Sequence, residues 1–386
     1  MKKVLATILA LVMALGLTTA AWADDAGVTC NGENCTHAAE FKGKHYTHLV
    51  DAYAALTRGT TKPAAAEEIT LLRDSSGGGI GSDTDTNMNY VIDFGGHTYT
   101  VGAPAVGSTG TVSQGLRVLQ TSTAKFMNGT LKADNYNGLA QVVHTYGDVT
   151  FENFNVDARE NSYAQIAVEP DCGTLNITGN SSILAREGMT GLYVAFWHTG
   201  TYNGTTVNVN TTGKITGKLV YEFDEDMTGD AVATENRAVL NIANGNFEIT
   251  GIQTLFSGVA NEALKEAKIE VSGGTFSTDV KEYLAEGKIL QKNGDTYTAV
   301  TNSGITSGTY TAKPTVPDGY KVVENTDGTF TVEKVGGYYY YQPTTDTKTT
   351  DTKGSPKTFD AGIALYVGMA LTSAAGVAFV GKKRED

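Results

Sequence analysis

A repeated unit in the middle of the chain constrains the fold more than any other feature. Each unit has a short apolar segment, a break rich in Gly, Asn or Ser, and a second apolar position five or six residues after the first. Successive units are offset by 25 to 33 residues. A unit of this size cannot bury its apolar face alone, so the repeats are expected to stack around a common core. The apolar pairs are Phe94 and Tyr99, Phe126 and Leu131, Phe151 and Val156, Ile177 and Ile183, Val209 and Ile215, Ile242 and Phe247, and Val271 and Phe276.

The local pattern inside each unit predicts strands that turn a corner. Apolar residues alternate with polar ones, as at Leu175 and Ile177, which is typical of a strand with one buried face. Gly or Asn at the break tolerates the left-handed backbone conformation that a sharp corner requires. We therefore predict a mainly β fold, a parallel β-solenoid over residues 65–287. An antiparallel β-sandwich with hairpin turns is the alternative.

The repeat pattern, over about residues 65–280, resembles the right-handed parallel β-helices of the pectate-lyase-like class. The resemblance lies in the pattern and not in a catalytic motif, because the clustered Asp pairs and the Gly-His-Gly turn of related glycosidases are absent. It implies a right-handed coil with a long side surface. Fold alone does not assign an activity.

Both ends of the repeat region are expected to be capped, because exposed strand edges pair with other chains. In the N-terminal Cys/His segment, residues 24–64, apolar residues at helical spacing predict a short helix that ends before Gly59. After the repeats, a short helix is expected over residues 279–286. Two hairpins around NGD and TDG then form a small β-module, residues 288–341. The apolar residues at helical spacing in the N-terminal segment are Leu49, Ala52, Tyr53 and Leu56.

Residues 1–23 have the three parts of a secretory signal. Lys2 and Lys3 precede an apolar stretch over residues 4–17, and Ala21 and Ala23 form an A-x-A cleavage pattern around Trp22. This order predicts export and a mature chain that begins near Asp24.

The C-terminal segment, residues 355–386, predicts a membrane span. Residues 361–381 carry no charge and are followed by a basic cluster, residues 382–384. As a helix this stretch would be roughly 31 Å long, enough for a bilayer core. Upstream, residues 342–354 are rich in threonine and should form a solvated stalk.

The pentapeptide SPKTF precedes the span. Together with the apolar stretch and the basic tail, it resembles the sorting signal of Gram-positive wall-anchored proteins, in a divergent version such as those of sortase B-type substrates. The resemblance implies that a sortase cuts after Thr358 and joins the chain to peptidoglycan. Ser355 replaces the usual Leu and Phe359 the usual Gly, and a plain membrane anchor is the alternative. The motif residues are Ser355, Pro356, Lys357, Thr358 and Phe359.

The formal net charge of −13 gives no electrostatic footprint for nucleic acid, so no nucleic-acid partner is expected. A strongly acidic exported domain also repels anionic polymers, which argues against a polyanionic substrate.

Cysteine use leaves two interpretations open. Cys30 and Cys35 lie in CNGENCTH, close to His37 and His45. A disulfide across this small loop suits an exported chain and is the favoured interpretation. The alternative is a zinc site built from the two cysteines and nearby histidines, although no metal is the leading expectation. Cys172 is expected to be a small buried residue.

Few carboxylates suggest chemistry. The run DTDTNMN offers alternating oxygen ligands for calcium, but it lacks the Gly and Glu of an EF-hand loop. Asp157, Arg159 and Asp171 are weak catalytic candidates, since Asp and Arg on neighbouring coils can act as acid or base. No cofactor is expected, and whether the protein is an enzyme stays open, with non-catalytic binding favoured.

Aromatic residues suggest a glycan surface. Tyr193, Trp197 and Tyr202 lie within ten residues, in an apparent insertion. Exposed aromatic rings stack on sugars, whereas the alternative is a buried strand in which Val194 and Phe196 face inward. We expect an extracellular, wall-anchored protein that acts in adhesion by binding a glycan or another cell-surface partner. A polysaccharide-degrading lyase or glycoside hydrolase and a passive structural protein are the alternatives.

Overall fold

The computed structural model describes residues 27–30, 35–108, 110–196, 204–224, 237–259, 262 and 265–336. The signal segment with Ala21 and Ala23, the stalk, the sorting pentapeptide 355–359 and the span 361–381 lie outside these residues. Within the described part, no helix has the length and apolar character needed to cross a bilayer.

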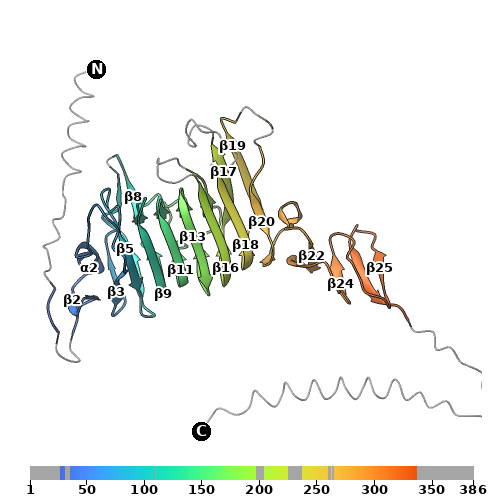
Figure 1. Ribbon diagram of the computed structural model, residues 1–386, viewed down its shortest axis with the longest axis horizontal. Coiled ribbons are helices and arrows are strands. Elements are labelled where there is room, and N and C mark those ends of the chain that lie inside the picture. Colours follow the sequence, from blue (N-terminus) through green and yellow to red (C-terminus); the bar gives the residue numbers. More distant parts are fainter. Residues whose placement is uncertain are drawn as a thin grey trace, which may run out of the picture. The chain divides into compact units, whose positions relative to one another are not determined.

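Two largely parallel β-sheets form the main body (Figure 1). The first sheet collects the corner strands of the repeats, which pair in parallel from one unit to the next. Its repeat strands are β3 (Glu67–Leu71), β4 (Ser75–Gly77), β5 (Asn89–Asp93), β6 (Thr98–Val101), β9 (Thr123–Ala133), β11 (Asp148–Asp157), β13 (Gly173–Gly179), β14 (Ser182–Leu184), β16 (Thr205–Thr216), β18 (Ala238–Glu248), β20 (Ile269–Val271) and β21 (Thr275–Phe276).

The second sheet is built from the segments between the corners. Each of its strands lies in sequence between two strands of the first sheet, so the chain alternates between the sheets. Its strands pair in parallel from β8 to β19, and β7 pairs antiparallel with β8. They are β7 (Val106–Ser108), β8 (Thr111–Val118), β10 (Gln141–Thr145), β12 (Ile166–Pro170), β15 (Thr190–Val194), β17 (Lys218–Asp224) and β19 (Ile252–Ser257).

The apolar pairs predicted from the sequence are register neighbours in the first sheet. After the corner, one continuous row runs through Tyr99, Leu131, Val156, Ile183, Ile215, Phe247 and Phe276. Before the corner, a second row runs through Ile92, Phe126, Phe151, Ile177, Val209, Ile242 and Val271. The prediction is wrong at one position: Ile92 occupies the place assigned to Phe94. The parallel pairing excludes the antiparallel sandwich for these strands.

The corners use the left-handed conformation that the sequence predicts. Asn128, Asn153 and Gly179 have φ angles of 55°, 52° and 65°, and they follow directly on register neighbours in β9, β11 and β13. Asparagine and glycine are the residues that adopt this conformation at the least cost. The same turn is therefore repeated in successive coils.

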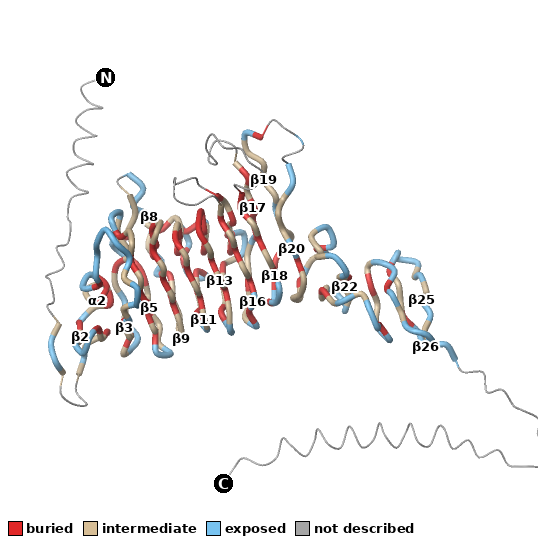
Figure 2. The backbone as a smooth tube through the Cα atoms, viewed as in Figure 1, coloured by how far each residue is buried: buried red, intermediate tan, exposed pale blue. Residues whose placement is uncertain are grey.

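The inward faces of the two sheets share one buried core. Val143, Val168 and Leu192 of the second sheet belong to the same buried cluster as Phe126 and Phe151 of the first. Figure 2 shows the resulting alternation of buried and partly exposed positions along the strands. The outward face of the second sheet is left free to carry polar side chains.

The N-terminal end begins with a hairpin and a helix. β1 (Ala39–Phe41) pairs antiparallel with β2 (Lys44–Tyr46) and with β3. Helix α2 (Leu49–Ala54) buries Leu49, Ala52 and Tyr53, and Leu56 is also buried, as the spacing predicts.

The C-terminal end departs from the prediction in one respect. The helix expected over residues 279–286 is reduced to a 3-10 turn, η2 (Lys281–Tyr283). The two predicted hairpins form as β22 (Lys288–Asn293) with β23 (Thr296–Thr301), and β25 (Tyr320–Glu324) with β26 (Phe330–Lys334). Strand β24 (Gly308–Tyr310) joins them, and β23 pairs antiparallel with β21.

Candidate functional site

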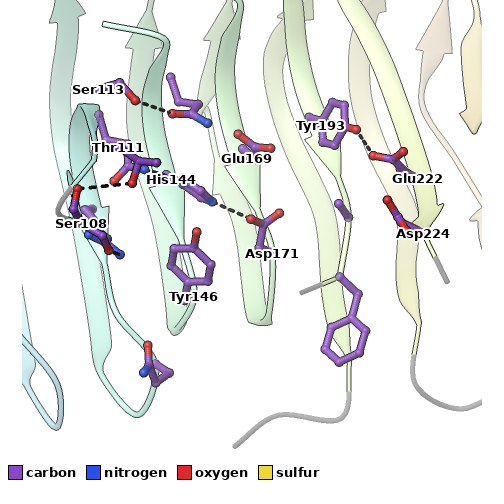
Figure 3. Close-up of a pocket in the computed structure, with 16 residues that line it drawn as sticks. Ser108, Thr111, Ser113, His144, Tyr146, Glu169, Asp171, Tyr193, Glu222 and Asp224 are labelled. Carbon is purple, nitrogen blue, oxygen red and sulfur yellow. Dashed lines mark hydrogen bonds and ion pairs between the residues drawn. The ribbon is translucent and has the colours of Figure 1, made fainter. Parts of the chain in front are cut away.

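A polar groove of about 590 Å³ lies on the outward face of the second sheet (Figure 3). Its lining residues come from successive parallel strands, so residues far apart in sequence become neighbours at nearly the same level. Arg117, His144 and Glu169, for example, are register neighbours on β8, β10 and β12. The lining residues are Ser108, Thr111, Ser113, Gln114, Arg117, Gln120, Gln141, His144, Tyr146, Glu169, Asp171, Tyr193, Ala195, Phe196, Glu222 and Asp224.

A buried chain of hydrogen bonds crosses the groove floor. Gln114 Nε2 lies 2.9 Å from His144 Nδ1. His144 Nε2 lies 2.6 Å from Asp171 Oδ2 (Figure 3). With Gln114 donating to Nδ1, the imidazole carries its proton on Nε2 and donates it to Asp171. All three residues are buried. The network fixes the ring and orients the Asp171 carboxylate.

The pKa of the Glu169 carboxyl group in the groove lies near neutral pH. Desolvation, and then the negative charge of Asp171, raise its pKa from 4.5 to about 7. Its Oε2 atom is buried and has no hydrogen-bond partner among the described residues. A carboxyl group of this kind holds a proton near pH 7 and can donate it, which is how general acids work.

Other polar atoms of the groove are also unpartnered. Gln114 Oε1 and the Nε and Nη1 atoms of Arg117 are buried without a hydrogen-bond partner in the described chain. Arg117 Nη2 donates to Ser108 Oγ at 2.7 Å, and its guanidinium lies 5.7 Å from the Tyr146 ring centroid. Buried polar atoms without partners are costly, and such atoms gathered around one groove indicate a place for a polar ligand.

The far end of the groove combines an aromatic ring with a carboxylate. The Tyr193 hydroxyl donates to Glu222 Oε2 (Figure 3). The Ser257 hydroxyl donates to Glu222 Oε1 at 2.6 Å. Burial and the hydrogen bond to Glu222 raise the pKa of Tyr193, which stays a neutral phenol. The Tyr193 ring is half-buried and held at its hydroxyl, so it is a preorganised surface for a ligand.

The same groove has the donor atoms of a divalent-metal site. One atom each from His144, Glu169 and Asp171 lie within 4.8 Å of one another. A nitrogen and two carboxylate oxygens suit Zn²⁺ or Mn²⁺. The hydrogen bond between His144 and Asp171 already uses one atom of each, so a metal would have to displace it.

The structure separates the predicted catalytic candidates. Asp171 lies in the groove, whereas Asp157 ends β11 in the other sheet. Arg159 Nε and Nη2 donate to Asp157 at 2.9 and 2.7 Å. Although desolvation favours the protonated form, the hydrogen bonds from Arg159 lower the pKa of Asp157. Asp157 and Arg159 thus form an ion pair with each other, away from the groove.

The predicted glycan contacts are divided. Tyr193 lines the groove, while Trp197 and Tyr202 lie outside the described residues. Val194 and Phe196 are buried, as the alternative interpretation of this segment expected. The segment therefore serves as a core strand and at the same time presents Tyr193 to the groove.

The remaining predicted sites have clear positions. Cys30 and Cys35 are free thiols in the structure, so the favoured disulfide is not formed, and Cys172 is buried as expected. In the DTDTNMN run, Asp85 accepts hydrogen bonds from Arg58 Nε at 2.8 Å and from the Tyr53 hydroxyl at 2.9 Å. These bonds engage both Asp85 carboxylate oxygens, which leaves Asp85 a structural role.

Sequence reasoning missed most of the groove. The sequence pattern singles out Asp171 and Tyr193 among the groove residues, but it does not indicate that His144 and Glu222 lie beside them. The strands that carry the groove residues are weak patterns in the sequence. Three of them are short, largely apolar runs with a polar residue near the end: QVVHT, IAVEP and KLVYEFD. Runs of this length read equally well as loops or strands.

No protein-family model matches the chain, and neither a curated protein nor a solved structure is significantly similar to it. The groove is therefore interpreted from its own residues.

Proposed function

We propose that this chain is an extracellular surface protein that binds a glycan in the groove of its second sheet. The observation that carries the proposal is the gathering, in one groove, of buried unpartnered polar atoms with the Tyr146 and Tyr193 rings. Sugars are recognised by this combination: hydrogen bonds to hydroxyls and stacking on aromatic rings. Arg117, Gln114 and Glu169 supply donors and acceptors that a hydroxyl-rich ligand would satisfy.

The charge of the groove indicates the class of glycan. Four acidic side chains line it, against one permanent cation, Arg117. They are Glu169, which is partly protonated near pH 7, and Asp171, Glu222 and Asp224. Such a surface repels polyanions such as pectin or sulfated glycans. A neutral glycan or one that carries amino groups fits better.

Hydrolysis of a glycosidic bond is the second candidate function. It is favoured by the raised pKa of Glu169, about 7, and by the position of Asp171, with one atom of each carboxyl group within 4.8 Å. A carboxyl group that keeps its proton near neutral pH, beside a second carboxyl group, is the arrangement that acid-assisted glycoside hydrolysis uses. In this role Glu169 would protonate the leaving oxygen.

A glycan panel tests the groove. The chain should bind at least one neutral or amino-bearing glycan saturably, and Tyr193→Ala should weaken binding about tenfold, since loss of an aromatic stacking contact costs ~1 kcal/mol or more. Tyr193→Phe keeps the ring and should retain most of the affinity. Isothermal titration calorimetry measures all three.

Tyr163→Ala is the matched control, because Tyr163 is 52% exposed and does not line the groove. Equal binding by Tyr193→Ala and Tyr163→Ala, or no saturable binding to any glycan, would contradict the proposal.

Incubation of the chain with the same glycans separates the two functions. Reducing ends that appear with the native chain and disappear with Glu169→Gln indicate hydrolysis, and binding without release of reducing ends indicates a binding protein.

The location of the protein is part of the proposal. The signal-like residues 1–23, the threonine-rich stalk, SPKTF and the apolar stretch 361–381 support export and attachment to the cell wall of a Gram-positive organism. Sortase and peptidoglycan are the partners that this implies.

We also propose that the two-sheet body forms a right-handed coil, because parallel strands joined by crossovers are right-handed almost without exception.

Substitution of the sorting residue tests attachment. Thr358→Ala should shift the protein from the covalently bound wall fraction to the membrane and medium, because it removes the side chain of the motif threonine after which a sortase would cut. Immunoblots of lysozyme-released wall and of culture medium measure the shift. Lys357→Ala, at a position that the motif does not constrain, is the control. Equal wall attachment of native and Thr358→Ala chains would refute sortase processing at this site.

A further inference from the structure

Two cysteines and two histidines converge at the N-terminal end of the described chain. Cys30 Sγ lies 3.0 Å from His37 Nδ1, and Cys35 Sγ lies 3.3 Å from His37 Nδ1 and 2.9 Å from His45 Nδ1. One atom from each of the four side chains lies within 4.8 Å of all the others. All four residues are half-buried. We propose that these four side chains bind a structural zinc ion, through two sulfur atoms and the Nδ1 atoms of both imidazoles.

The distances fit a tetrahedral centre. With Zn–S near ~2.3 Å and Zn–N near ~2.0–2.1 Å, sulfur and nitrogen ligands of one tetrahedron stand about 3.5 Å apart. The three observed sulfur–nitrogen distances, 3.0, 3.3 and 2.9 Å, lie below this value. Ligation therefore requires these atoms to move apart by roughly 0.2–0.6 Å. Four protein ligands close the coordination shell, which is the mark of a structural rather than a catalytic zinc site.

The backbone holds the ligands in place without the metal. His45 lies on β2, in register with Glu40 of β1, and its backbone exchanges two hydrogen bonds with Val28, of 3.0 and 2.7 Å. This bridge places the segment that carries Cys30 beside the β1–β2 hairpin. His37 and Cys35 immediately precede β1. The site thus joins three backbone segments that are already adjacent.

The outer surroundings of His45 also fit metal binding. Its Nε2 atom lies 3.8 Å from Glu40 Oε2, while its Nδ1 atom faces the sulfur of Cys35. Metal-ligating histidines commonly present their second nitrogen to a carboxylate, which orients the ring and strengthens its basicity. A carboxylate on the neighbouring strand gives His45 this arrangement.

Zinc would secure the beginning of the stacked coils. β1 pairs with β3, the first strand of the repeat region, so a metal on the β1–β2 hairpin clips the N-terminal segment to the edge of the first sheet. Edges of stacked sheets require such covers, because open edges pair with other chains. The site therefore serves the fold and does not depend on the glycan groove.

Metal analysis of the full chain tests the site. Chain purified without reductant or chelator and dialysed against equimolar ZnCl₂ should hold one zinc by plasma mass spectrometry. With Co²⁺ in place of zinc, it should show the visible bands of tetrahedral thiolate ligation. The double variant Cys30→Ser/Cys35→Ser should lose both signals, and His37→Ala should weaken zinc binding at least tenfold, because one of four ligands is removed.

Two controls give the test its specificity. Cys172 remains in every variant, so a cobalt–thiolate band that survives in the double variant would come from elsewhere and would overturn the assignment. His97→Gln removes an imidazole that pairs with Asp74 at 3.5 Å, and it should bind zinc as the native chain does. A Cys30–Cys35 disulfide in the freshly purified chain, found by non-reducing peptide mapping together with absence of bound zinc, would also overturn the proposal.

Discussion

Phe126→Ala should lower the free energy of unfolding by about 3–5 kcal/mol, the range for removal of a fully buried aromatic side chain. Phe126 is 0% exposed, and its ring lies 6.0, 6.1 and 5.8 Å from the rings of Tyr90, Phe151 and Phe154. These neighbours come from the coils on both sides of β9. The substitution therefore removes contacts at two interfaces between coils as well as the ring itself.

Because Phe126 lies in a central coil of the stack, its substitution should reduce the stability of both neighbouring coils as well as of its own. In repeat proteins stability is approximately the sum of unit and interface terms, so weakening one central unit affects both neighbours. Urea unfolding followed by far-UV circular dichroism should show a lower midpoint. A broader or biphasic unfolding transition would show that the coils on the two sides of the cavity left by Phe126→Ala unfold separately.

Lys125→Ala is the matched control, because Lys125 is the adjacent residue on the same strand with a partly exposed side chain. It loses one surface ion pair, Lys125 Nζ to Glu152 Oε2 at 2.9 Å, which is worth less than ~1 kcal/mol. If Phe126→Ala cost no more than Lys125→Ala, the stacked aromatic core would not be the main source of stability in this region.

The success of the sequence prediction at Phe126 has a physical reason. Apolar residues at corresponding positions of each unit must face inward, because every coil buries its apolar side against the next coil. The regular spacing of apolar residues in the sequence therefore predicts the buried row from Tyr99 to Phe276. The one error, Phe94 in place of Ile92, arose because both residues are apolar, fully buried and two positions apart, which is the period of a strand.

The second sheet is harder to predict because some of its strands are short and hold apolar residues at adjacent positions. In β10 the residues Val142 and Val143 are both fully buried, so the alternation that marks a half-exposed strand is missing. The groove depends on these strands. His144 and Glu169 are 25 residues apart in sequence and become adjacent only through the register of β10 with β12. A single sequence does not specify that register.

The cysteine cluster illustrates a different limit. Composition and spacing allowed either a disulfide or a metal site, because both need two sulfurs a few residues apart. The choice depends on His45, which is brought to Cys35 by the β1–β2 hairpin and by the bridge to Val28. Backbone hydrogen bonds of this kind leave no pattern in the sequence.

Glu169→Gln should stabilise the protein above neutral pH by about 2 kcal/mol. The pKa of Glu169 is raised from 4.5 to about 7, and a shift of this size corresponds to ~3 kcal/mol of unfavourable free energy for the charged form in the folded state. Glutamine has the same shape and no charge. We expect less than the full amount, because the amide N–H group that replaces an oxygen needs an acceptor in the groove.

The pH dependence gives the sign of this effect. Between pH 4.5 and about 7 the folded chain keeps the Glu169 proton and the unfolded chain releases it, so this group makes the native protein less stable as the pH rises through that window. Above pH 7 the full cost is present. The stabilities of the native chain and of Glu169→Gln should thus agree near pH 4.5 and separate progressively up to pH 8, as measured by urea unfolding at each pH.

Glu160→Gln is the control for this series, because the Glu160 side chain is 71% exposed and forms a surface ion pair with Lys132 at 2.7 Å. It should change stability by less than ~1 kcal/mol. Stabilisation by Glu169→Gln alone would mean that the fold retains a costly carboxyl group in the groove, as binding and catalytic sites commonly do. A Glu169→Gln chain that is no more stable than the native chain at pH 8 would instead mean that Glu169 is solvated, and the proton-donor role proposed for it would then fail.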